Sequence, residues 1–363
     1  MTGTTDIILF GTGAFAARIA FDLAANSEEP LHVTIAGRNP ARLDWLRTAA
    51  NARAVIFNRP ARFEVHSVDL SGEDAASELI ARLSPCIVVQ AASPLPSSII
   101  ATKGNAWSGL IARGGLSIMA VPWAIFSVRV ARAIKTVDSS CHFINCSYPD
   151  VNNSLLAALG LPITCGTGNV SILASVFAAA LDARRPGQLK ALVHYQTITP
   201  FRKPLQERRG PMPRIWIDDI EIEDVFEATR VVKLTPEPVI DISGAGGVPL
   251  MLALVSGRDW QGHAPAPFGL PGGYPVACTN GKLELALPKG LSRDEAVAWN
   301  GAFESENGLF VDDNGQARFT GIQHDELKRH SPELARGFNV EDIDQVYEEF
   351  TALQRRLIDT PAD

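Results

Sequence analysis

The start of the chain places a short apolar run before a glycine-rich turn, and this order restricts the fold more than any other feature of the sequence. Residues 7–10 are all large and apolar, as in a buried parallel strand. A turn follows, and then a helical pattern that extends to residue 25. In such a turn one glycine permits the bend, and a second lets the backbone approach a pyrophosphate. The sequence therefore predicts a dinucleotide site whose contacting residues are Gly11, Thr12, Gly13, Ala14 and Phe15.

The end of the second expected strand, residues 33–36, indicates which dinucleotide binds. An acidic residue there would accept hydrogen bonds from the ribose 2′-hydroxyl of NAD. This chain instead has Arg38 and Asn39, and Arg42 follows one helical turn later. The Arg38 guanidinium can hold a 2′-phosphate through paired hydrogen bonds, and Arg42 could add a second cation. The sequence therefore favours NADP(H), with Arg38, Asn39 and Arg42 in the site. The other interpretation is a solvated turn before a basic helix.

Strand and helix patterns alternate over the first 149 residues and predict an α/β fold with a doubly wound parallel sheet. The expected strands are residues 7–10, 33–36, 63–68, 86–90, 116–121 and 142–146. Asp69 follows the third of these, where it contacts the adenine or caps the next helix. Ala91, Ala92 and Ser93 follow the fourth, where small side chains leave room for the cofactor's ribose and nicotinamide or allow tight packing.

The pattern changes after residue 148, so we expect two domains. Residues 1–149 form an NADP-binding Rossmann domain, and residues 150–363 form an α+β substrate domain. The second half combines helical patterns with loops rich in Gly and Pro and with β-rich segments at 190–198, 214–217, 231–234 and 282–287. An amphipathic pattern at 343–357 predicts a C-terminal helix that packs back on the first domain or supports a homodimer.

Composition limits the classes of function. The formal net charge is −7 at pH 7, whereas a nucleic-acid-binding protein would be basic. The longest apolar stretch, residues 116–128, contains Pro122 and is too short to span a bilayer. Five cysteines without Cys-x-x-Cys spacing indicate free thiols, and the seven histidines show no metal-ligand spacing. We therefore expect a cytoplasmic protein that binds a small molecule, without a metal, a nucleic-acid partner or a membrane.

Three segments together resemble the saccharopine dehydrogenase-like family of NAD(P)-binding oxidoreductases: residues 11–16, 36–39 and 91–94. The resemblance covers the first domain well and the rest of the chain only in general layout. It implies a Rossmann domain paired with an α+β domain that binds an amino-acid-like substrate. It also implies hydride transfer to an imine, formed between an amine and a carbonyl, or the reverse reaction. We therefore expect an NADPH-dependent reductase of a small imine or carbonyl compound with an anionic, amino-acid-like substrate.

Polar residues after the last expected strand are the main candidates for the chemistry. Tyr148 could donate a proton, and Asp150 could act as acid or base or bind a substrate ammonium. Asn152 and Asn153 could orient a carboxylate or carboxamide, although the segment is also typical of a capped turn before a helix. His194 lies in an apolar, strand-like run and is either a third acid/base candidate or a buried core histidine.

Two further segments could bind an anionic end of the substrate. Gly168 and Asn169 precede a long helical pattern, where backbone amides attract a carboxylate unless the segment only caps the helix. Arg202 belongs to a basic loop, residues 202–209, that pairs with the substrate, closes as a lid or remains exposed. The sequence leaves these alternatives open.

Two other functions are also open. Residues 146–149 resemble the Gly-Cys-Tyr-Pro turn of N-acetyl-glutamyl-phosphate reductases, in which the cysteine forms a thioester. An acylating semialdehyde dehydrogenase with Cys146 as nucleophile would need a lowered thiol pKa and a nearby base such as His194. Here Ser147 separates the cysteine from Tyr-Pro, which shifts the register of the nucleophile. A protein that senses NADP(H) without turnover would keep the same Rossmann site.

Overall fold

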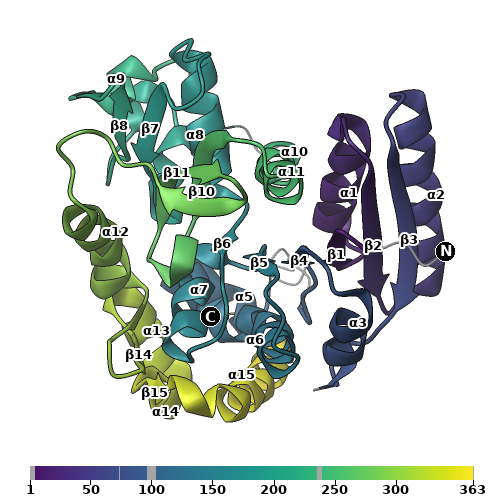
Figure 1. Cartoon of the computed structure of the whole chain (residues 1–363). Helices are drawn as coiled ribbons and strands as arrows, with labels where there is room; N and C mark the ends of the chain where they lie inside the picture. Colours follow the sequence, from purple (N-terminus) through teal and green to yellow (C-terminus); the bar gives the residue numbers. More distant parts are fainter. Residues whose placement is uncertain (1–4, 73, 96–103, 235–238, 363) are drawn as a thin grey trace.

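A computed structural model describes residues 5–72, 74–95, 104–234 and 239–362 (Figure 1). Within these ranges, six parallel strands form one sheet in the order β3-β2-β1-β4-β5-β6. The strands are β1 (Ile7–Phe10), β2 (Leu31–Gly37), β3 (Ala61–Ser67), β4 (Ile87–Gln90), β5 (His142–Asn145) and β6 (Cys165–Gly166). The order changes direction between β1 and β4, so the N-terminal part of the chain is a Rossmann fold. This confirms the predicted α/β class.

Strand β1 lies at the centre of the sheet because its side chains serve two cores. Ile8 and Phe10 pack into a core with helices α3, α5 and α6. Ile7 and Leu9 pack on the opposite face with α1, α2 and α11. All four residues are fully buried, as expected for a strand covered by helices on both faces. The covering helices are α1 (Ala14–Asn26), α2 (Pro40–Ile56), α3 (Ala75–Leu83), α5 (Ala106–Gly114), α6 (Ala120–Thr136) and α11 (Val248–Ser256).

The prediction of a strand at residues 116–121 is wrong. The segment is a short 3-10 helix, η1 (Leu116–Met119), followed by the start of α6. Helix α6 packs against β4, α3, α7 (Pro149–Ala158) and α15 (Ile343–Ile358), so it is apolar on nearly every side and lacks an amphipathic pattern. The apolar stretch at 116–128 is expected to be too short to span a bilayer, but the helical segment Leu116–Thr136 does have the length and composition of a membrane span. In the structure, 83% of its most apolar window is buried inside the protein.

The sixth strand of the sheet is β6, which pairs with β5 and lies beyond residue 149. Helix α8 (Asn169–Ala180) follows it directly. In the described part of the chain, three small antiparallel sheets come next, with the orders β7-β8-β9, β10-β11-β12 and β13-β14-β15. Their strands are β7 (Leu189–Leu192), β8 (Arg214–Ile217), β9 (Ile220–Glu221), β10 (Trp260–Pro265), β11 (Gly273–Thr279), β12 (Lys282–Leu285), β13 (Leu309–Val311), β14 (Gln316–Phe319) and β15 (Phe338–Asn339).

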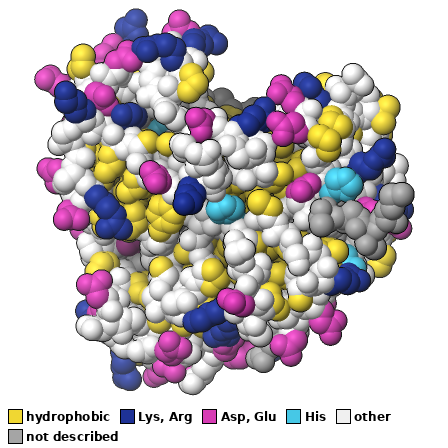
Figure 2. Space-filling view, in the orientation of Figure 1, with side chains coloured by type: hydrophobic (Ala, Val, Ile, Leu, Met, Phe, Trp, Pro, Cys, Tyr) yellow, Lys and Arg dark blue, Asp and Glu magenta, His cyan; other side chains and the backbone are white. Residues whose placement is uncertain are grey.

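The remaining helices join the small sheets to the Rossmann sheet. In Figure 1, α10 (Ile240–Ser243) and α11 lie beside α1, in agreement with their contacts. Helix α15 packs against α5 and α6. The others are α9 (Val225–Ala228), α12 (Arg293–Asn307), α13 (Gly321–His330) and α14 (Pro332–Ala335). Figure 2 shows acidic and basic side chains interspersed over the face of the molecule that Figure 1 presents.

Three expectations for the second half need correction. Strand β7 ends at Leu192, and η2 (Tyr195–Thr197) replaces the rest of the strand expected at 190–198. Residues 231–234 form no strand; Leu234 instead donates its backbone N–H to the Phe201 carbonyl and packs in a local core. Arg208, placed in a basic loop for which exposure is one of three alternatives, is buried because its guanidinium donates to the backbone carbonyls of residues 226, 229 and 232.

Candidate functional site

The turn after β1 has two glycines with different surroundings. Gly11 has φ +133°, and a Cβ there would lie 2.9 Å from the backbone carbon of Ala91. Gly13 has φ −73°, and a Cβ there would meet nothing within 4 Å. Gly13 and Ala14 are exposed, and no side chain caps the start of α1. The first amides of this helix therefore face open space, which is the arrangement that binds phosphate groups.

The three polar residues after β2 have different roles in the structure. Asn39 caps α2, because its side chain accepts a hydrogen bond from the Arg42 amide at 3.0 Å. The Arg42 Nε donates to the Thr12 carbonyl at 3.1 Å, so this side chain supports the glycine turn. Arg38 is exposed at the end of the strand. Arg38 is therefore the guanidinium that is free to meet a ligand beside the turn.

Asp69 lies close to this end of the sheet. The Ser71 amide donates to its carboxylate at 2.9 Å, and this hydrogen bond lowers the pKa of Asp69. The positive charges of Arg38 and Arg129 lower the pKa further. The carboxylate of Asp69 is thus charged and exposed next to Arg38.

A chain of buried amides and hydroxyls holds the ends of β4 and β5 together. The Gln90 amide donates to the Ala92 carbonyl and to Ser127 Oγ, and Ser127 Oγ donates to Asn145 Oδ1 at 2.9 Å. Asn145 Nδ2 then donates to Asn153 Oδ1 at 2.8 Å, and Asn153 Nδ2 donates to the carbonyl of residue 266. Ala91, Ala92 and Ser93 are half-buried at this edge.

Asn152 and Asn153 differ in how far their amides are engaged. Both ends of the Asn153 amide bond within the protein, so it supports the framework rather than a ligand. Asn152 Nδ2 donates to the Ser147 carbonyl at 2.8 Å, whereas its buried Oδ1 has no protein partner. Asn152 therefore keeps a free acceptor.

Tyr148 begins α7 in a left-handed conformation with φ 50°. Its ring packs edge-on against Trp123 and Tyr195, with centroid distances of 5.6 and 5.1 Å. Its hydroxyl lies 2.9 Å from Ser117 Oγ, which also lies 2.9 Å from the Tyr195 hydroxyl. Burial raises the pKa of Tyr148 well above the usual value, so the phenol keeps its proton.

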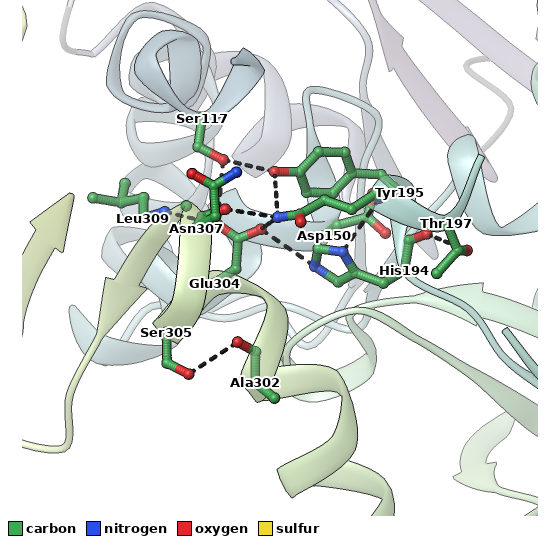
Figure 3. A network of polar contacts seen from close by, with 12 residues as sticks. Ser117, Asp150, His194, Tyr195, Thr197, Ala302, Glu304, Ser305, Asn307 and Leu309 are labelled. Carbon is green, nitrogen blue, oxygen red and sulfur yellow. Dashed lines mark hydrogen bonds and ion pairs between the residues drawn. The ribbon is translucent and has the colours of Figure 1, made fainter. Parts of the chain in front are cut away.

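His194 is fully buried and follows the end of β7. Its ring stacks on Phe303 with a centroid distance of 4.5 Å. Its Nδ1 accepts a hydrogen bond from the Gln196 amide at 3.3 Å. Nε2 lies 3.3 Å from Glu304 Oε1, within ion-pair distance but outside hydrogen-bond geometry. His194 is thus oriented toward a carboxylate (Figure 3).

Asp150 completes this cluster. Its side chain is fully buried; Oδ2 accepts from Asn169 Nδ2 at 3.1 Å, and Oδ1 has no protein partner. Burial raises the pKa of Asp150, and the nearby charge of His194 opposes this effect. The structure therefore brings Tyr148, Asp150 and His194 into one buried cluster, where the candidate acid/base groups lie close together.

Two members of the cluster, Ser117 and Glu304, have no counterpart in the sequence analysis. Ser117 lies in η1, and Glu304 lies on α12 with 4% of its surface exposed. A lone glutamate in a helix with many charged residues, such as α12, carries no signal for burial.

The start of α8 contains a second uncapped helix end. Gly168 has φ +137° and is buried, yet a Cβ there would meet nothing within 4 Å. The neighbouring Thr167 Oγ1 is buried without a protein partner. No side chain caps α8, and Asn169 at its first position bonds Asp150. Arg202 is exposed on η3 (Thr199–Arg202) and takes no part in the network of Figure 3.

The surroundings of Cys146 disfavour a nucleophilic thiolate. Cys146 packs against the core formed by α1, α2 and the sheet. Burial raises the pKa of its thiol, with a smaller contribution from Cys165. Among the described residues, no group of three or more His, Cys, Asp or Glu side chains could hold a metal ion.

Comparison with solved structures supports the fold. The chain is similar to the malate dehydrogenase of Archaeoglobus fulgidus in complex with NADH, with 14% identity, a TM-score of 0.52 and coverage of 80% of this chain and 94% of that one. It is also similar to the apo malate dehydrogenase of Picrophilus torridus, with 12% identity, a TM-score of 0.53 and coverage of 97% and 100%. A lactate dehydrogenase of Cryptosporidium parvum, with lactic acid and nicotinamide adenine dinucleotide, has 14% identity, a TM-score of 0.50 and coverage of 96% and 99%. No protein-family profile matches the sequence, and no curated protein is significantly similar to it.

Proposed function

We propose that the protein is an NADPH-dependent oxidoreductase that reduces a small imine or carbonyl compound. The observation that carries this proposal is the turn after β1, where Gly13 leaves open space beside the uncapped amides of α1. These groups fit a pyrophosphate. The malate dehydrogenase of Archaeoglobus fulgidus, which has a similar fold, is described with NADH, and this supports a nicotinamide cofactor here.

The residues after β2 support the phosphorylated cofactor. Arg38 is exposed, and the segment from Gly37 to Arg42 contains no acidic residue. A guanidinium at this position binds a 2′-phosphate, whereas NAD requires a carboxylate for the 2′-hydroxyl. The Asp69 carboxylate lies near enough to Arg38 for this cation to lower its pKa, so it could compete with that phosphate. Its position after β3 suits the adenine rather than the ribose.

The start of α8 and Asp150 together fit an α-amino acid. The uncapped amides beside Gly168 attract a carboxylate, and Thr167 Oγ1 is free to bond it. Asp150 Oδ1, also free, could accept a hydrogen bond from an amine. The two sites are adjacent because Asn169 bonds Asp150. An amine and a carboxylate on one carbon would therefore meet complementary groups.

The bound cofactor would supply the hydride, and the protein would supply the proton. Reduction of a C=N or C=O bond leaves nitrogen or oxygen in need of one proton, which a buried acid must deliver. Tyr148, Asp150 and His194 are the candidates. Burial raises the pKa of both Tyr148 and Asp150, a shift in the direction that suits an acid.

The test is cofactor binding followed by turnover. Purified protein would be titrated with NADPH and with NADH by fluorescence, and the NADPH complex would then be mixed with pooled 2-oxo acids, with and without amino acids. We expect tighter binding of NADPH, and oxidation that requires both amine and carbonyl. Oxidation with carbonyl alone would identify a carbonyl reductase. Binding without any oxidation would favour a sensor of NADP(H), and absence of binding would refute the proposal.

A further inference from the structure

The cluster of Figure 3 raises the question of how a buried proton donor is recharged. Tyr148 and His194 are both buried, and neither lines the groove between α7, α12 and β13. Each reduction consumes one proton, and the donor must recover it before the next turnover. A group that contacts both donors and reaches the solvent side of the cluster would meet this need.

Glu304 has this position. Its Oε2 accepts a hydrogen bond from Ser117 Oγ at 3.2 Å, and Ser117 Oγ lies 2.9 Å from the Tyr148 hydroxyl. Its Oε1 lies 3.3 Å from His194 Nε2. One carboxylate therefore joins both donors, directly on one side and through a hydroxyl on the other (Figure 3).

The carboxylate is held in place by groups that are not themselves acids. The Leu309 amide donates to Oε2 at 2.7 Å, and Gln196 Nε2 lies 3.4 Å from Oε1. Gln196 also donates to the Asn307 carbonyl at 2.8 Å, which fixes its amide. These contacts define the direction of both oxygens, so Glu304 remains aligned with Ser117 and His194.

A solvent route reaches Glu304 from α7 and α12. Glu304 and Asp150 both line a groove between these helices and β13, together with Ser305 and Asp313. The groove has a volume of about 910 Å³, which is room for many water molecules. Water in this groove could bring protons to the face of α12 from which Glu304 enters the cluster.

We propose that Glu304 is a proton-relay residue that recharges the donor from this groove. The donor gives its proton to the reduced substrate and is left as a phenolate if Tyr148 donates, or as a neutral imidazole if protonated His194 donates. The Glu304 carboxylate takes a proton from solvent through water in the groove, passes it to His194 Nε2 or through Ser117 to Tyr148, and returns to the carboxylate form. No oxidant is needed, because the electrons move only in the hydride step. The proposal rests on the reductase function above.

The first test replaces Glu304 with glutamine, which keeps the shape and an oxygen for the Leu309 amide. Glu306→Gln is the matched control, since Glu306 is exposed on the same helix. We expect E304Q to lower kcat at least about tenfold, to leave the KM for NADPH within about twofold, and to change the pH profile of kcat. Glu304→Asp should recover part of the loss. A kcat and pH profile equal to those of E306Q would overturn the relay.

The two branches are separated by Ser117→Ala, which breaks the link to Tyr148 and leaves His194 Nε2 beside Glu304. If kcat of S117A falls as far as that of E304Q, the relay leads to Tyr148. If kcat of S117A is unchanged while that of E304Q is lowered, the relay leads to His194. If E304Q does not fold, a proton inventory on the wild type decides. A curved dependence of the steady-state kcat on deuterium content supports a relay, and a linear one overturns it. Absence of NADPH oxidation by the wild type would instead refute the reductase function itself.

Discussion

The two glycines of the turn after β1 should respond in opposite ways to a side chain. Gly13 has φ −73° and ψ 179°, the extended conformation of an ordinary helix N-cap, and open space around it. Gly11 has φ +133° and a neighbouring backbone carbon 2.9 Å from its Cβ position. We therefore predict that Gly13→Asp folds well but loses NADPH, whereas Gly11→Ala is destabilised.

The magnitudes follow from capping and strain. An Asp at position 13 could accept from the free amides of α1 and interact with the helix dipole, which together contribute about 0.5–1 kcal/mol. The same carboxylate would accept the hydrogen bonds of the amides that a pyrophosphate needs, and its negative charge would repel the pyrophosphate. Two lost charge-assisted hydrogen bonds of about 1.5–3 kcal/mol each reduce the affinity at least about 100-fold. At Gly11, a side chain at positive φ costs about 1–3 kcal/mol before the contact with Ala91 is counted.

Thermal unfolding and cofactor titration on the same samples test this prediction. The Tm of G13D should equal or exceed that of the wild type, while fluorescence enhancement by NADPH is lost. The Tm of G11A should fall by several degrees, at about 2–4 °C per kcal/mol or somewhat less for a chain of this size. Wild-type NADPH affinity in G13D would refute the assignment of the α1 amides to the pyrophosphate. An undiminished Tm in G11A would refute the strain argument.

Three further predictions concern other parts of the molecule. Arg38→Ala should lower the affinity for NADPH about tenfold and the affinity for NADH less than about threefold, because one exposed charge-assisted contact to the 2′-phosphate is lost. Equal losses of affinity for the two cofactors in the titration would contradict the 2′-phosphate assignment. Asp150→Asn should lower kcat and remove a pH effect on stability. Burial raises the pKa of Asp150 in the folded protein. Its contribution to the free energy of unfolding is therefore present below the ordinary carboxyl pKa and is lost as the pH rises through the raised value. Denaturant titrations at several pH values would detect this pH dependence in the wild type and its absence in the variant. Cys146→Ala should retain turnover, since burial raises the pKa of this thiol, and inactivation of the variant would instead favour the acylating mechanism.

The N-terminal fold could be predicted because its signals are local. The strand at 7–10, the glycine turn and the helix after it each occupy a few adjacent residues, and the structure has them as β1, the turn and α1. Residues 116–121 gave the wrong prediction for a physical reason. A short apolar run fits a buried strand and a helix enclosed on all sides equally well, and periodicity cannot separate them. Strand β6 has two residues, too few for any pattern to form.

The cofactor residues illustrate a second limit. The pattern after β2 identified a basic segment, but its three polar side chains have three different roles: Asn39 caps a helix, Arg42 bonds the turn, and Arg38 is exposed. Helix geometry and the fold of the turn decide which polar side chain forms hydrogen bonds with the backbone. A sequence pattern therefore predicts the presence of a binding cation more reliably than its identity.

The acid/base cluster shows why sequence could name the donors without ordering them. Tyr148 and Asp150 lie two positions apart in the sequence, and His194 stands out by its residue type within an apolar, strand-like run. The residues that connect Tyr148 and His194 are distant, since the hydrogen bond between Ser117 and Glu304 joins positions 187 residues apart. In a low-dielectric cluster the proton affinity of each group depends on its partners more than on its own chemistry. Under the proposed mechanism the order of the candidate donors depends on the carboxylate that they share, and experiments that change Glu304 and Ser117 separately would resolve it.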